Sequence, residues 1–220
     1  MAGIFQDDLR EEAMRQLFGL YKDEEEGRSG IDAFLELEGQ WIPFELKTTS
    51  NGSVTTVRDF GLDHIIKWQG KHWLIGFFIN TTITYKYGSP AMMAEWIRDK
   101  SDYIAKDMAL KNLAPQKLTL TDLYAILGKK KFYTLTDAKN LQKNQYNKEQ
   151  YLALQDCDQG YTPQRMLTLL QERLKYLIAR GSTLNNPHIP FKYFDNWFEI
   201  TENHAETLRK LVKQQLNNEY

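Results

Sequence analysis

The sequence predicts an α/β protein in which a small mixed sheet is flanked by helices and followed by a mainly helical C-terminal region. Residues 31–37 and 41–47 alternate apolar and polar side chains, as strands with one buried face do. Residues 5–21 and most segments beyond residue 90 carry apolar side chains at helical spacing instead. Strands near the N-terminus with helices before and after them indicate the α/β class.

The N-terminal helix is expected over residues 5–21. Its apolar side chains recur every three or four residues, which is the spacing of one helix face. They are Leu9, Ala13, Leu17, Leu20 and Tyr21. Glu12 falls beside this apolar stripe, whereas Glu11 points away from it. Glu12 is therefore the acid of this helix that becomes a candidate site residue.

The strands at 31–37 and 41–47 lie so close together that a hairpin turning at Glu38-Gly39 is the economical connection. Proline cannot donate a backbone hydrogen bond. Pro43 therefore predicts that the second strand pairs on one side only near that point, or is bulged there.

The rest of the chain divides into a short strand-containing part and a long helical part. Residues 48–56 are expected as a polar loop, 59–69 as a short helix and 72–80 as a buried strand. Ser89-Pro90 places a cap residue before a first-turn proline, which predicts a helix to about residue 110. Further helices are expected over 121–127, 136–144, 147–156, 163–180 and 202–216. We therefore divide the chain into a core, 1–110, and a helical region, 111–220, packed on it.

Composition indicates an ordinary globular protein. Hydrophobic residues make up 42% of the chain and charged residues 26%. The longest strongly apolar run, Trp73 to Ile79, is far shorter than the roughly 20 residues of a membrane helix. Cys157 is the single cysteine and has no internal disulfide partner, which suits a reducing compartment. A cytoplasmic protein without a membrane segment is expected.

Charge is distributed unevenly along the chain. Residues 1–40 hold eleven acids against four bases, so this end is no general phosphate-binding surface. Residues 101–150 hold nine lysines against five acids. A polyanion could bind the second region while metal ions neutralise the acidic end.

The hairpin brings three chemically active residues together. Its register places Asp32 across from Glu45, and strand alternation puts Lys47 on the same face as Glu45. Opposed carboxylates repel each other unless a positive group lies between them. A divalent cation suits that position, because two carboxylates bind Mg²⁺ and leave positions for water and substrate phosphate. A nearby lysine can then orient the water or stabilise developing negative charge.

At these residues the chain resembles the PD-(D/E)XK nucleases. Asp32, followed after twelve residues by Glu45-Leu46-Lys47, is similar to that family's Asp and Glu-x-Lys signature on adjacent strands. The resemblance covers about residues 5–80 and implies an αβββαβ core like that of restriction endonucleases. Ile31 stands where the motif usually has proline.

The resemblance implies a metal-dependent endonuclease that hydrolyses phosphodiester bonds in double-stranded DNA. Asp32 and Glu45 would bind Mg²⁺, with Mn²⁺ as a substitute, Lys47 would assist the water, and Glu12 would be an additional acid. The compact chain has no ATPase motif, which favours a sequence-specific type II restriction enzyme. A homodimer is expected because a two-strand break needs two such centres.

Two segments are candidate DNA-binding surfaces. Hydroxyl, amide and guanidinium groups suited to phosphates and base edges follow the second strand; they are Ser50, Asn51, Thr55, Thr56 and Arg58. Lys129, Lys130 and Lys131 lie between two short expected helices, as in a helix-turn-helix-like reader. A flexible polar loop and solvated helix faces are the alternative interpretations of these two segments. The helical region 111–220 is accordingly expected to contact DNA or a second subunit.

Other functions remain open. A structure-specific nuclease such as a Holliday-junction resolvase would use the same chemistry. A non-catalytic DNA-binding module could retain the fold, and a purely structural protein is the remaining possibility. The presence together of Asp32, Glu45 and Lys47 favours an enzyme over the last two.

Overall fold

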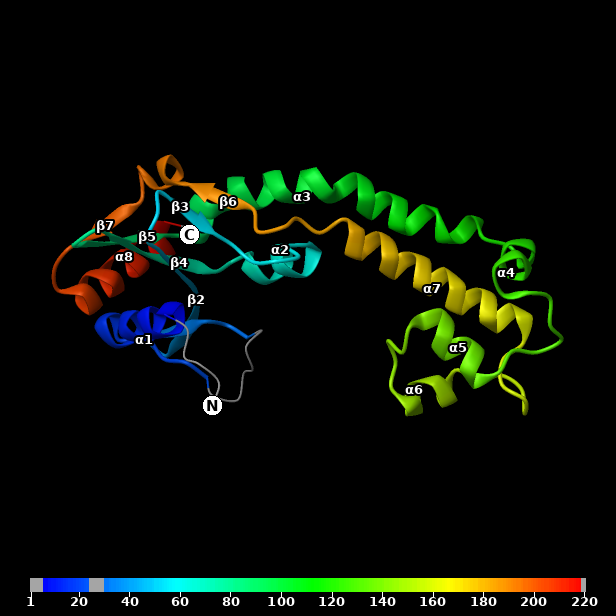
Figure 1. Cartoon of the computed structure of the whole chain (residues 1–220). Helices are drawn as coiled ribbons and strands as arrows, with labels where there is room; N and C mark the ends of the chain where they lie inside the picture. Colours follow the sequence, from blue (N-terminus) through cyan, green and yellow to red (C-terminus); the bar gives the residue numbers. More distant parts are fainter. Residues whose placement is uncertain (1–5, 24–29, 219–220) are drawn as a thin grey trace. The chain divides into compact units, whose positions relative to one another are not determined.

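The computed structural model describes residues 6–23 and 30–218 and divides the chain into two compact units (Figure 1). Unit 1 is discontinuous and comprises Met1–Ser101 and Leu184–Tyr220. Unit 2 comprises Asp102–Thr183. Unit 2 is therefore an insertion within the sequence of unit 1.

Unit 1 is built on a mixed five-stranded sheet, which confirms the expected α/β class. The strand order is β1-β2-β4-β5-β7. The strands are β1 (Ala33–Leu37), β2 (Gln40–Thr49), β4 (His72–Ile79), β5 (Thr82–Gly88) and β7 (Phe198–Ile200). Only β2 and β4 pair in parallel, while the other neighbours are antiparallel. A separate two-stranded sheet pairs β3 (Ser53–Thr55) with β6 (His188–Pro190).

The β1–β2 hairpin has the expected turn and register. Glu38 and Gly39 both have positive φ, 52° and 78°, as a two-residue type I′ turn requires. Ala33 pairs with Phe44, so the strand register is the one that the sequence predicted. Pro43 pairs with β1 only, because the ladder between β2 and β4 begins at Phe44. The prediction of one-sided pairing at Pro43 is thus confirmed.

Helices α1 (Gln6–Phe18) and α8 (His204–Asn218) cover one face of this sheet, and Figure 1 shows them beside each other. Apolar side chains from both helices and from all five strands form one core there. Its fully buried members include Met14, Phe18, Leu35, Phe44, Leu46, Leu74, Leu208 and Val212. Burial of this apolar surface is the main stabilising contribution to unit 1.

Aromatic rings fill the opposite face. Trp68, at the end of α2 (Leu62–Trp68), packs edge-on against Trp73 of β4 at 4.9 Å between ring centroids. Phe60 contacts Trp68 at 5.0 Å and Trp96 at 5.5 Å. All four rings are at most 5% exposed. The sheet is therefore buried on both faces around β4, and polar groups between its strands and these rings are largely shielded from water.

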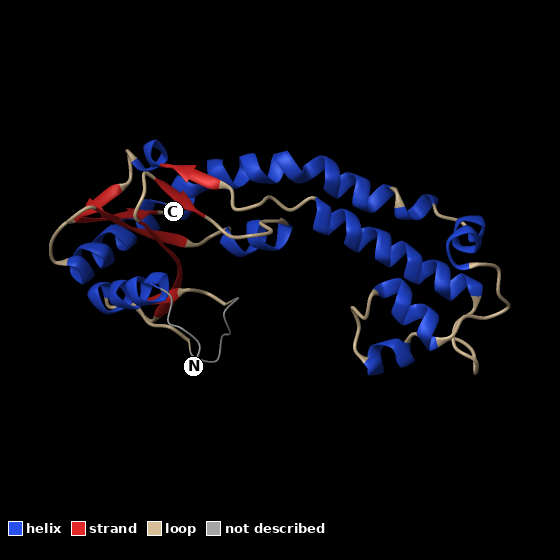
Figure 2. Cartoon of the chain, viewed as in Figure 1, coloured by secondary structure: helices blue, strands red, loops and turns tan. Residues whose placement is uncertain are grey.

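Unit 2 is helical (Figure 2). It contains the end of α3 (Pro90–Leu113) and four further helices, α4 (Leu120–Leu127), α5 (Leu135–Gln142), α6 (Lys148–Ala153) and α7 (Pro163–Gly181). Thr134, Asn147 and Thr162 accept capping bonds from backbone amides at the starts of α5, α6 and α7. These caps satisfy amides that a helix leaves without partners. No helix of the described chain is long and apolar enough to cross a membrane.

The chain after unit 2 returns to unit 1, which corrects the expected division into 1–110 and 111–220. β7 adds the last strand of the sheet, and α8 packs against α1. The mainly helical character of 111–220 is confirmed. β7 has only three residues, too few for side-chain periodicity to identify it.

Three other strands, β3, β5 and β6, were not predicted. β5 begins after a turn in which Asn80 has φ 55° and alternates polar and apolar side chains that the sequence interpretation left unassigned. β3 lies within the segment expected as the loop 48–56, and β2 extends to Thr49. The loop prediction is therefore wrong for Ser53–Thr55, because a strand distant in sequence, β6, provides the pairing partner.

Phe18 anchors α1 to the sheet, and its removal tests that packing. Its ring contacts Tyr85 at 5.1 Å and His204 at 5.2 Å and is fully buried. We expect Phe18→Ala to lower the free energy of unfolding by about 3–5 kcal/mol, because it leaves a cavity in the core. Leu17→Ala, at a side chain 40% exposed, should change it by less than about 1 kcal/mol. Urea denaturation measures both, and equal effects would contradict this packing.

Candidate active site

Asp32 lies immediately before β1, where the hairpin opens. The β1–β2 ladder ends at the pair Ala33 and Phe44, so β2 continues past the end of β1. The Asp32 carboxylate takes the place of the missing strand, because its Oδ2 accepts a hydrogen bond of 3.0 Å from the Leu46 N–H. This bond fixes the position of the carboxylate at the open end of the hairpin.

Lys47 connects the two acids of the hairpin. Its Nζ lies 2.9 Å from Glu45 Oε1 and 3.5 Å from Asp32 Oδ2, and it donates to the Leu46 carbonyl at 2.9 Å. The Lys47, Asp32 and Glu45 side chains are 14%, 20% and 3% exposed. The register thus brings the three candidate residues together, with an ammonium group between the carboxylates.

Lys71 is a fourth member of this cluster, and sequence reasoning did not assign it this role. Its Nζ donates to Glu45 Oε2 at 2.8 Å, and its side chain is only 3% exposed. Lys71 precedes β4, and the parallel register pairs Glu45 with Trp73 of that strand. The sequence did contain a signal for this role, because Lys71 directly precedes a strongly apolar strand. A lysine buried at such a position generally needs a charged partner.

The cluster sets the charge state of its members. Burial alone would raise the pKa of Glu45, but the positive charges of Lys47 and Lys71 outweigh it and hold this pKa well below its ordinary value. Burial alone would lower the pKa of Lys47, but the carboxylates of Glu45 and Asp32 raise it above its ordinary value. Glu45 and Lys47 are therefore both charged at neutral pH.

Helix α1 presents Glu11, not Glu12, to the cluster. The buried side of α1 contains Met14, Arg15 and Phe18, and Glu11 lies on that side one turn earlier. Burial, opposed by Lys47 and reinforced by Asp32, raises the pKa of Glu11 to about 7. The Glu11 carboxyl is therefore the group of this site that titrates near neutrality.

The expected role of Glu12 as the acid facing the site is corrected. The Glu12 side chain is 52% exposed and pairs with Arg15 at 2.7 Å. Hydrogen bonds from Arg15 and Gln16 lower its pKa. The error came from the apolar stripe chosen, because Leu9 and Leu17 are 57% and 40% exposed.

The donor chemistry of this cluster fits a hard divalent cation. Asp32 and Glu45 offer carboxylate oxygens that converge on one point, the position of the Lys47 ammonium, and Glu11 adds a third carboxyl nearby. Mg²⁺ commonly takes one or two protein carboxylates and completes its shell with water and phosphate. Within residues 6–23 and 30–218, no group of three or more His, Cys, Asp or Glu side chains is already arranged around an ion site.

The predicted DNA-contacting segment after β2 is partly engaged within unit 1. Thr56 donates to the Pro187 carbonyl at 2.7 Å, and Thr55 lies 3.4 Å from a ring nitrogen of His188. Ser50 accepts a bond of 2.9 Å from Arg10. Asn51 and Arg58 have exposed side chains. Ser50, Asn51 and Arg58 remain the better candidates for contacts with a ligand.

The predicted lysine cluster lies in unit 2, between α4 and α5. Lys129, Lys130 and Lys131 are exposed, and Lys130 pairs with Asp137 at 2.8 Å. Unit 2 carries thirteen Lys and Arg against eight Asp and Glu, whereas unit 1 carries fifteen against twenty-one. The positive charge of the chain is thus concentrated in unit 2.

No protein-family model matches this sequence, and neither does any curated protein.

Glu11→Gln tests the electrostatics of the cluster. Because the folded-state pKa of about 7 lies above the ordinary value of 4.5, wild-type stability should fall as the pH rises between these values. In EDTA at pH 8, we expect the variant to be about 1–2 kcal/mol more stable than wild type, after allowance for solvent around this partly exposed side chain. Below pH 4.5 this gain should disappear, as measured by urea denaturation across pH.

Glu12→Gln is the matched control on the adjacent residue. It removes an exposed carboxylate whose pKa is lowered, so it should give no gain in stability at pH 8. A pH-independent effect of Glu11→Gln, or the same gain from both variants, would show that Glu11 is not the buried acid.

Proposed function

We propose that this chain is a metal-dependent endonuclease that hydrolyses phosphodiester bonds in double-stranded DNA. The observation that carries the proposal is the convergence of the Asp32 and Glu45 carboxylates on the ammonium of Lys47, next to the titrating acid Glu11. Two acids that can hold a cation, one lysine and an acid of near-neutral pKa are groups that can carry out metal-dependent phosphodiester hydrolysis.

Asp32 and Glu45 would hold the divalent cation. When bound, Mg²⁺ or Mn²⁺ polarises the scissile phosphate and lowers the pKa of a bound water. The Leu46 N–H orients Asp32 and Lys71 orients Glu45, each through a hydrogen bond to one oxygen. The oxygens that face Lys47, Glu45 Oε1 and Asp32 Oδ2, would bind the ion once the ammonium group moves aside.

Lys47 and Glu11 would act on protons and developing charge. The Lys47 ammonium, no longer needed between the carboxylates, can donate to a phosphate oxygen or to the attacking water. Glu11, with a pKa of about 7, can take up or release a proton at neutral pH. The cluster therefore provides both charge stabilisation and a proton-transfer group.

Unit 2 is the proposed source of nonspecific DNA affinity. It carries a net positive charge while unit 1 is net negative, and phosphate neutralisation by Lys and Arg drives nonspecific binding. Sequence-specific cleavage of the type II restriction kind, by a cytoplasmic homodimer, extends this proposal. A structure-specific nuclease would use the same cluster on branched DNA.

A second candidate function is a non-catalytic DNA-binding module. The observation that favours it is the double pairing of Glu45, whose oxygens are held by Lys47 and Lys71. Such an ion network can stabilise a fold without performing chemistry. Metal-dependent cleavage distinguishes the two functions directly.

The decisive experiment combines cleavage with binding for wild type, Asp32→Asn and Lys47→Ala. Asparagine retains an oxygen for the Leu46 N–H but removes the charge of Asp32, so the hairpin end is preserved. We expect Asp32→Asn to abolish cleavage of long duplex DNA in Mg²⁺. Lys47→Ala should lower the single-turnover rate by about 10² or more, the order expected for one charge-stabilising group.

DNA affinity in EDTA, measured by fluorescence anisotropy, should remain close to wild type for both variants. Thermal unfolding must first show that each variant is folded. DNA binding by wild type without any cleavage in Mg²⁺ or Mn²⁺ would favour the non-catalytic module. Full-speed cleavage by either variant would remove that residue from the mechanism.

The role of unit 2 is tested by the triple variant Lys129→Gln, Lys130→Gln and Lys131→Gln. Each lost phosphate contact should reduce the slope of log affinity against log salt by about 0.9 for duplex DNA. The pair Lys192→Gln and Lys210→Gln, on exposed lysines of unit 1, is the control. Anisotropy titrations at several salt concentrations give the slopes, and an unchanged slope for the triple variant would place these lysines away from DNA.

A further inference from the structure

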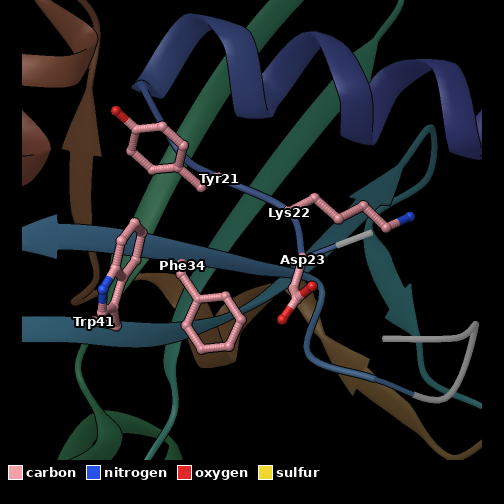
Figure 3. Close-up of a pocket in the computed structure, with 5 residues that line it drawn as sticks. All are labelled: Tyr21, Lys22, Asp23, Phe34 and Trp41. Atoms are coloured by element: carbon pink, nitrogen blue, oxygen red, sulfur yellow. The ribbon is translucent and has the colours of Figure 1, made fainter. Parts of the chain in front are cut away.

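Three aromatic side chains line an open pocket on the β1–β2 hairpin (Figure 3). Tyr21 packs edge-on against Trp41 with ring centroids 5.4 Å apart, and Phe34 lies 6.4 Å from Trp41. Tyr21 is held beside β1 by two backbone hydrogen bonds with Phe34, of 2.7 and 2.8 Å. We call these three residues the aromatic site.

The aromatic site is accessible. Trp41 is 58% exposed and Tyr21 54%. The other four tryptophans of the chain are at most 5% exposed. The pocket has a volume of about 420 Å³, and Lys22 and Asp23 complete its lining. Exposed aromatic groups of this kind commonly mark a binding surface.

The aromatic site lies on the same face of the hairpin as the candidate active site. Phe34 is paired with Pro43, and alternation places Trp41, Pro43 and Glu45 on one face of β2. At a rise of about 3.3 Å per residue, Phe34 is roughly 7 Å along β1 from Asp32, and Trp41 is roughly 13 Å along β2 from Glu45. A nucleic acid bound at the acids would therefore reach these rings with a neighbouring nucleotide.

We propose that the aromatic site stacks an unpaired nucleobase next to the phosphate that the candidate active site cleaves. This inference rests on the proposed nuclease function in its structure-specific form, which acts on DNA with unpaired nucleotides. Aromatic side chains stack bases of any sequence, and each such contact contributes measurably to binding of single strands. Lys22 and Asp23 give the pocket wall one charge of each sign, so stacking on the rings would provide the binding. A base within an intact duplex is already stacked, so the ligand is a nucleotide at an end, a nick or a branch.

Trp41 provides a direct spectroscopic test, because stacking of a base on an indole ring changes its fluorescence. Wild type and Asp32→Asn would be titrated in EDTA with a short oligothymidylate and with a blunt duplex of equal length. We expect the oligothymidylate to quench tryptophan emission in both proteins. The blunt duplex should quench it much less at equal occupancy, which is measured separately by anisotropy.

Three variants separate stacking from general loss of apolar surface. Trp41→Leu should bind labelled oligothymidylate about tenfold more weakly, within the range for one stacked base. Trp41→Phe, which retains a ring, should stay within about threefold of wild type by anisotropy. Ile66→Ala, at an apolar side chain 59% exposed on α2, should bind like wild type. Circular dichroism would confirm that all three are folded.

The outcomes distinguish this inference from the proposed function. Quenching and weakened Trp41→Leu binding without cleavage by wild type would support the aromatic site and overturn the nuclease. Cleavage by wild type with unchanged oligothymidylate affinity in Trp41→Leu would overturn the aromatic site alone. Sedimentation of the DNA-free protein completes the test. If wild type sediments as a dimer and Trp41→Leu sediments as a monomer, a second copy of the chain occupies the pocket. That result would also overturn the inference.

Discussion

The arrangement of unit 1 depends on how the buried charge of Glu45 is compensated. A carboxylate taken out of water is tolerated only where positive groups and hydrogen bonds replace its hydration. Glu45 meets this condition through Lys47 from its own strand and Lys71 from the chain before β4. The parallel pairing of β2 with β4 is what brings these lysines to opposite oxygens of one side chain. Removal of one lysine would leave the other charges incompletely compensated in the interior.

The same arrangement bears on how the acids would hold the proposed ion. The β1–β2 ladder ends at the pair Ala33 and Phe44, so no backbone carbonyl of β1 pairs with the Leu46 N–H. This N–H donates to the Asp32 side chain instead and holds it in place. Lys71 fixes Glu45 from the far side, and Lys47 occupies the space between the two acids. An entering cation would therefore exchange places with a side chain that is already positive. The ion would add positive charge between the two carboxylates, and the hydrogen bonds from the Leu46 N–H and Lys71 would be retained.

Sequence reasoning identified the hairpin, its register and three residues of the site, because strand alternation and a two-residue turn are local properties. Sequence reasoning missed the pairing of Lys71 with Glu45, because the two residues lie 26 positions apart and only the tertiary structure joins them. The Glu11 orientation was missed because a helix with exposed leucines gives a misleading apolar stripe. The strands β3, β6 and β7 are too short for periodicity. Their existence depends on partners that are distant in sequence.

The insertion of unit 2 also affects how the protein is made. The fifth strand of the sheet and the helix that packs on α1 lie beyond residue 184. A ribosome must therefore synthesise the 82 residues of unit 2 after the hairpin is complete, which takes roughly 4–16 s at ordinary elongation rates. During that interval the core face of the sheet lacks α8 and remains open to water. A chain whose synthesis stops within unit 2 would contain every acid of the candidate site. It would lack the strand and the helix that complete the core of unit 1.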